Sequence, residues 1–68
     1  MTEHHVEYYD EETSLWHPLT GFDENGAPTL DDTITLNEVT GPQLADELQA
    51  LHPEMEIKYH KIEIRFEP

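Results

Sequence analysis

The chain has 68 residues, of which 16 are Asp or Glu and three are Lys or Arg, so its formal net charge is −13. This length predicts a single acidic domain spanning residues 1–68, which would bury roughly 60% of the surface of the unfolded chain. The lack of cysteine excludes disulfides and thiolate metal sites. The negative charge argues against direct binding to nucleic acids or anionic membranes, because like charges repel.

The first two predicted elements form a β-hairpin. Residues 4–9 combine β-favouring side chains with polar alternation, which predicts a half-buried strand. Residues 10–14 are a polar run of turn length, and residues 15–17 resume a β-prone sequence. Pro18 is expected to end this second strand, since proline has no N–H to donate to a β-ladder.

Residues 20–32 are predicted to form a loop. Asn25-Gly26 within it is a strong signal for a tight turn. Residues 33–36 then alternate polar and apolar side chains, which predicts a short third strand.

A helix is the most strongly marked element. Thr40 and Gln43 have the spacing of a capping box, with Thr40 as the N-cap, and Pro42 suits the first turn. Pro53 is expected to stop the helix after His52. Apolar residues at helical spacing predict one buried stripe, formed by Leu44, Ala45, Leu48 and Leu51.

The last predicted strand, residues 55–66, contains a change of phase. Met55, Ile57 and Tyr59 share one face, whereas Ile62, Ile64 and Phe66 have the opposite parity. A bulge near residues 60–61 would return both sets to one face. A tight turn there is the alternative, and the bulge is favoured because no Gly, Asn or Pro marks a turn.

Together these elements predict an α+β fold, a small antiparallel sheet in the order β-β-β-α-β with one helix packed on one face. Residues 1–3 and 67–68 are expected to fray.

The distribution of charge is the main indication of function. Residues 1–57 contain fourteen acidic residues and no Lys or Arg, and the three cations follow in the last strand. This favours binding to a basic protein surface, most specifically the groove of a nucleic-acid-binding protein that the acidic chain would occupy as a mimic. Solubility is the competing explanation. The candidate partner-binding residues lie in predicted loops or at element ends: Asp10, Glu11, Glu12, Asp23, Glu24, Asp31 and Asp32.

Tyr9 is a candidate aromatic anchor for the same partner. Adjacent Tyr8 and Tyr9 point to opposite faces of a strand, so at least one is expected on the exposed side of the sheet. Burial beneath the 20–32 loop is the competing explanation.

The sequence predicts no cofactor, no dedicated metal site and no enzyme activity. Residues 23–26 lack the downstream glutamate of a calcium loop, and adjacent His4 and His5 face opposite sides of a strand. A Gly-rich phosphate loop, a nucleophile elbow and a Cys/His pair are all missing from the sequence. The five histidines predict a response to mild acid, because imidazoles gain charge there and reduce self-repulsion.

Two stretches, Val6-Glu7-Tyr8-Tyr9-Asp10 and Trp16-His17-Pro18-Leu19, with Thr13 between them, precede a short capped helix and a terminal strand. This layout resembles small acidic accessory proteins of bacteriophages and actinobacteria. In size and charge the chain is similar to phage-encoded inhibitors such as nucleic-acid-mimicking anti-restriction and anti-CRISPR proteins. The resemblance implies an inhibitor and transfers no functional residue.

The alternative function is a structural or assembly module, either a homo-oligomer or a phage-particle subunit. In that case the last strand would carry the contact, with Lys58, Lys61 and Arg65 meeting an acidic patch on a second copy. Either function is expected in the cytoplasm, the host cytoplasm for a phage-encoded protein, because the N-terminus lacks the basic flank and apolar run of a secretory signal.

Overall fold

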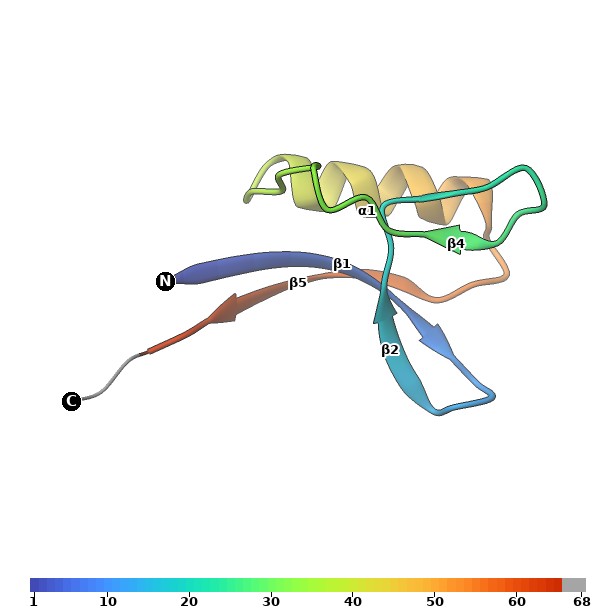
Figure 1. Cartoon of the computed structure of the whole chain (residues 1–68), viewed down its shortest axis with the longest axis horizontal. Coiled ribbons are helices and arrows are strands. Elements are labelled where there is room, and N and C mark those ends of the chain that lie inside the picture. The colour runs from blue at the N-terminus through green and yellow to red at the C-terminus, as the bar shows by residue number, and fades with distance from the viewer. Residues whose placement is uncertain (66–68) are drawn as a thin grey trace.

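The computed structural model describes residues 1–65. Three antiparallel strands form its main sheet in the order β2-β1-β5: β1 (Thr2–Asp10), β2 (Leu15–Pro18) and β5 (Ile57–Glu63). Helix α1 (Thr40–Leu51) packs against one face of this sheet (Figure 1). The predicted α+β class, with one helix on one face of an antiparallel sheet, is confirmed. None of the described helices is both long enough and apolar enough to cross a membrane.

The middle of the chain differs from the prediction. Residues 20–32 contain a small two-stranded sheet, β3 (Gly21–Phe22) with β4 (Pro28–Thr29), around the predicted turn, in which Gly26 has φ +80°. The strand predicted at 33–36 is wrong. Asp31 Oδ1 accepts hydrogen bonds from the Thr33 N–H and hydroxyl, and the Ile34 N–H bonds to the Asp31 carbonyl, so a local turn takes donors that a ladder would need.

The core lies between the helix and the sheet. Val6 from β1, Ile57 from β5 and Leu19 just after β2 are each at most 6% exposed, and Ala45 and Leu48 meet them from α1. Burying a Val, Leu or Ile side chain contributes roughly 1.5–3 kcal/mol. A core with only five buried residues within residues 1–65 therefore leaves little reserve of stability.

The ladder between β1 and β5 is regular. Its paired residues run without interruption from Thr2–Glu63 to Tyr8–Ile57. The predicted bulge at 60–61, and the alternative turn there, are therefore both wrong. The regular register leaves Ile62 on the face away from the helix, where it is 43% exposed. Phe66, the last residue of the predicted strand, lies outside the described residues.

The N-terminus of the chain is hydrogen-bonded to Ile64, which follows β5. The Met1 carbonyl accepts a hydrogen bond of 2.7 Å from the Ile64 N–H, and the Met1 amino group donates to the Ile64 carbonyl. Thr2 and Glu3 also belong to β1, and the fraying of residues 1–3 stays a prediction. The expectation for residues 67–68 lies outside the described residues.

The N-terminal cap of helix α1 is formed by Asn37, three residues before the predicted N-cap, Thr40. Thr40 and Gln43 do not form the capping box; instead, Asn37 Oδ1 accepts hydrogen bonds from the Val39 and Thr40 N–H groups. Thr40 Oγ1 in return accepts the Asn37 N–H at 2.9 Å. These two reciprocal hydrogen bonds between Asn37 and Thr40 are those of a capping box. The box lies at residues 37–40, three residues earlier than predicted, because the backbone of Val39 is already helical.

The buried stripe of α1 is also shifted. Gly41, Ala45 and Leu48 are buried, whereas Leu51 is 68% exposed, which contradicts its predicted core position. At Gly41 the sheet comes so close that a Cβ would lie 2.6 Å from Cδ1 of the Tyr59 ring. The helix ends at Leu51, one residue before the predicted end at His52.

Candidate functional site

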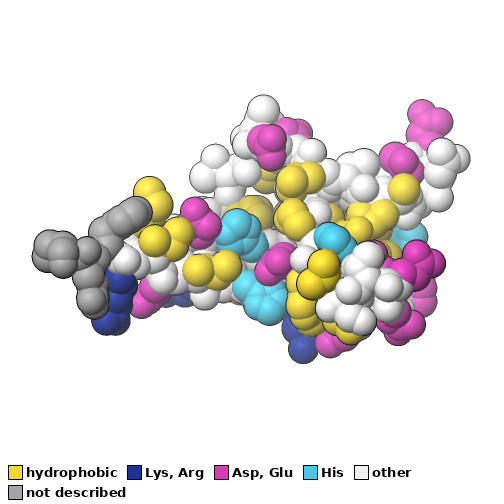
Figure 2. Space-filling model, turned by 60° about the horizontal axis from the view of Figure 1, so that its bottom comes forward, with side chains coloured by type: hydrophobic (Ala, Val, Ile, Leu, Met, Phe, Trp, Pro, Cys, Tyr) yellow, Lys and Arg dark blue, Asp and Glu magenta, His cyan; other side chains and the backbone are white. Residues whose placement is uncertain are grey.

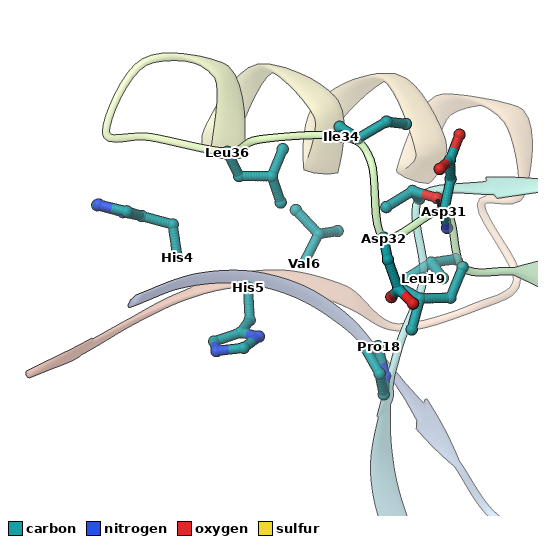
Figure 3. Close-up of a pocket in the computed structure, with 11 residues that line it drawn as sticks. His4, His5, Val6, Pro18, Leu19, Asp31, Asp32, Ile34 and Leu36 are labelled. Carbon is teal, nitrogen blue, oxygen red and sulfur yellow. Dashed lines mark hydrogen bonds between the residues drawn. The ribbon is translucent and has the colours of Figure 1, made fainter. Parts of the chain in front are cut away.

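A small pocket opens between the sheet and the segment that leads to the helix. Its volume is about 200 Å³, and strand β1, residues 18–20 and residues 30–36 line it. Val6 and Leu19 form its buried apolar part, and the half-buried Leu36 adjoins them (Figure 3). Leu30 and Ile34, 55% and 45% exposed, complete the apolar lining nearer to solvent.

Two of the predicted partner-binding residues, Asp31 and Asp32, lie at this pocket. Figure 3 shows their side chains pointing in opposite directions, and both residues line the pocket together with Pro18 and Leu19. The Asp31 carboxylate is engaged in the turn, because both the side chain and the backbone N–H of Thr33 donate to it and hold its pKa below the usual range. The Asp31 N–H donates to Thr20 Oγ1 at 2.8 Å, which ties the segment to the sheet.

The other predicted acidic residues lie in two turns at separate corners of the molecule (Figure 1). Asp10 and Asp23 have structural roles there. Asp10 Oδ1 accepts the Glu12 N–H in the β1–β2 turn, and Asp23 Oδ1 accepts the Asn25 and Ala27 N–H groups in the β3–β4 turn. Of the seven predicted acidic residues, Glu11, Glu12, Glu24 and Asp32 are the ones whose carboxylates accept no hydrogen bond within residues 1–65.

Tyr9 lies on the sheet face opposite the helix. Its neighbour Tyr8 packs against the core, so alternation along β1 turns Tyr9 outward, as the sequence predicts for one member of the pair. There it is half-buried against Trp16, with ring centroids 5.4 Å apart. This contact is made across the β1–β2 pair, in which Tyr9 lies directly opposite Trp16.

The same face contains a cluster of titratable side chains. His60 packs edge-on against Trp16, and its Nε2 is buried without a hydrogen-bond partner among residues 1–65. Glu7 Oε1 is 3.9 Å from this nitrogen, too far for a hydrogen bond but close enough for an ion pair with a charged imidazole. His5 lies directly opposite His60 across the strands. In the part of the chain that the structure describes, no group of three or more such side chains is arranged to hold a metal ion.

The two lysines are paired with acidic residues. Lys61 Nζ donates to Glu38 Oε1 at 2.9 Å, an interaction that lowers the pKa of Glu38 and raises that of Lys61. Lys58 Nζ lies 3.3 Å from Glu56 Oε1 and 5.8 Å from the centre of the Trp16 ring. Figure 2 shows acidic side chains in separate groups across the visible face, with Lys and Arg side chains along its lower edge.

No protein-family model, curated protein or solved structure matches this chain. The geometry therefore has to carry any functional conclusion. The sequence did not predict the apolar lining of this pocket, because it placed Leu30 in a loop and Ile34 in a strand. The signal that could have found it is the run of apolar residues at 30, 34 and 36 around the Asp31-Asp32 pair.

Proposed function

We propose that the protein binds a basic surface on a partner protein and inhibits or modulates it. The expected partner is a nucleic-acid-binding protein, whose basic groove the chain would occupy as a mimic of DNA or RNA, as phage inhibitors do. The observation that supports this most is the run of 57 residues with fourteen acids and no Lys or Arg. The two lysines that follow pair with Glu38 and Glu56, so they offset little of the negative field elsewhere.

Such a field acts mainly on the rate of association. A surface of one sign can raise association rates by about 10 to 10³-fold, and salt screens the effect within a Debye length of about 10 Å at 0.1 M. The carboxylates free of local hydrogen bonds are the ones best placed to meet cations, because their lone pairs remain available. Glu11, Glu12, Glu24 and Asp32 therefore replace the larger predicted set as the leading contacts.

The test is affinity capture at low and high salt, followed by binding measurements with the purified captured protein. The chain is expected to compete with a 20-base-pair DNA duplex for that protein, and its affinity should fall steeply as salt rises. The variant E11Q/E12Q/E24Q/D32N should bind more weakly and show a shallower salt dependence.

A matched control removes the same number of charges elsewhere, in the variant E3Q/D46N/E47Q/E63Q. Weaker binding by the loop variant than by this control supports the turns and the pocket mouth as the contact surface. Unchanged affinity and unchanged salt dependence in both variants would contradict the proposal.

A second candidate is self-assembly through β5. This strand forms one edge of the main sheet, and no other strand of residues 1–65 pairs with its outer side. Ile62 adds an exposed apolar side chain there, but two copies at −13 each repel one another. Light scattering after size exclusion decides the matter: a monomer at all concentrations contradicts self-assembly.

A further inference from the structure

The pocket between β1 and residues 30–36 has dimensions that restrict what it can hold. Its volume of about 200 Å³ lies below the roughly 300–1,000 Å³ of small-molecule and cofactor sites. It is, however, large enough for one long side chain. An anchor residue from a docked protein is therefore a better fit than a free metabolite.

We infer that this pocket receives a lysine side chain of the basic partner. The inference rests on the proposed function and assigns a specific docking point to it. The pocket provides, within one small volume, an apolar wall for an aliphatic stem and a carboxylate for the ammonium group at its tip.

The apolar wall comes from three elements. Val6 on β1 and Leu19 after β2 are 2% and 1% exposed, so they belong to the rigid core and hold their positions. Leu30 extends this wall to the surface and is 55% exposed. A lysine has a four-carbon stem that gains by covering such apolar surface while its charged end stays near water.

The carboxylate is supplied by Asp32. It lines the pocket together with Leu19 (Figure 3), and no hydrogen bond within residues 1–65 engages its carboxylate. Asp31, in contrast, is held by Thr33 and stabilises the turn that places Asp32. The ammonium of an inserted lysine would pair with Asp32, and the surrounding negative charge would assist.

The same chemistry argues against other anchors. A leucine or methionine in this position would take water from Asp32 without replacing its hydrogen bonds, which is unfavourable. An acidic side chain would be repelled by Asp31, Asp32 and the net charge of the chain.

The experiment uses the full chain, the peptide tetralysine as the probe, and its neutral counterpart in which every lysine is Nε-acetylated. Amide shifts of Val6, Leu19 and Asp32 are followed by two-dimensional NMR during titration. Two matched pairs of variants isolate the pocket: D32N against D46N, which remove the same charge, and L30S against L51S, which change the same exposed residue type.

Tetralysine is expected to shift the pocket amides, and the acetylated peptide is not. D32N should weaken binding up to about fivefold more than D46N, the effect of losing one partly exposed ion pair. L30S should weaken it more than L51S. Equal effects within both pairs, or shifts spread over all the acidic turns, overturn the inference. The proposed function survives that result if the captured partner still binds with steep salt dependence, and fails separately if it does not.

Discussion

At the scale of single residues, the side chain that matters most for the helix is Asn37. Its carboxamide oxygen satisfies two N–H groups at the start of α1, those of Val39 and Thr40. Its own N–H is satisfied by Thr40 Oγ1, and its carbonyl accepts the first helical hydrogen bond from Gly41. Residues 37–40 thus provide hydrogen-bond acceptors for three of the N–H groups that the start of a helix leaves unpaired.

We predict that Asn37→Ala lowers the free energy of unfolding by about 1 kcal/mol, the usual effect of losing an N-cap. The control is Gln43→Ala, at the position where the sequence pattern places the capping partner. Because Gln43 is exposed and makes no cap in the structure, its replacement should change stability by less than about 0.5 kcal/mol. Urea denaturation measures both, and a larger loss in Q43A than in N37A would contradict the observed cap.

At the scale of elements, the unbroken ladder between β1 and β5 determines which side chains enter the core. Strand side chains alternate, so residues 57 and 59 face the helix and residues 58, 60 and 62 face away. A bulge at residues 60–61 would have turned the side chain of Ile62 toward the core. The ladder therefore explains why an isoleucine remains 43% exposed in a domain with so small a core.

The register predicts opposite results for two isoleucines in the same strand. Ile57→Ala should cost about 2–5 kcal/mol, since Ile57 is 6% exposed within the core, and this loss could unfold the domain. Ile62→Ala should cost less than about 1 kcal/mol. Thermal unfolding followed by circular dichroism is sufficient. Comparable losses at the two sites would indicate the bulged register instead.

At the scale of the whole molecule, the charge opposes the fold that presents it. The sixteen acidic residues, offset by only three Lys or Arg, repel one another, and residues 1–65 contain only five buried core residues to oppose this repulsion. Part of this repulsion is offset locally, for example where Glu38 pairs with Lys61 and where the Glu54 carboxylate accepts a hydrogen bond from His52. The hydrogen bond from His52 lowers the pKa of Glu54.

The pair formed by Glu38 and Lys61 predicts a specific pH dependence. The pKa of Glu38 is lowered from 4.5 by the hydrogen bond and charge of Lys61, so its contribution is present above pH 4.5 and is lost as the pH falls through the folded pKa. The pKa of Lys61 is raised from 10.5, so its contribution is lost as the pH rises through that folded pKa. The coupling between the two should therefore be present between these limits.

A double-mutant cycle with E38Q and K61M measures this coupling without the change in net charge that each single variant introduces. We expect a favourable coupling free energy at pH 7 and none at pH 2, from thermal melts at low salt. High salt should reduce the coupling at pH 7 because both side chains are exposed. A coupling that stays constant from pH 7 to pH 2 would rule out this ion pair as its source.

Local chemistry could be predicted from the sequence. The hairpin with its polar turn, the Asn25-Gly26 turn, the end of the helix near Pro53 and the opposite orientations of Tyr8 and Tyr9 all follow from neighbouring residues. Composition alone also settled the charge, which carries the proposed function. These features depend on backbone preferences and on counting, so no distant contact is needed to decide them.

Distant contacts decided the rest. The register of β5 against β1 places Ile62 outside, and the approach of Tyr59 to Gly41 selects which helix face is buried. The turn at Asp31 replaced a predicted strand and formed one wall of the pocket, so Asp32 became the candidate contact among several equivalent acids. Sequence established that the chain is acidic and α+β, whereas packing between remote segments decided which of its carboxylates line the pocket.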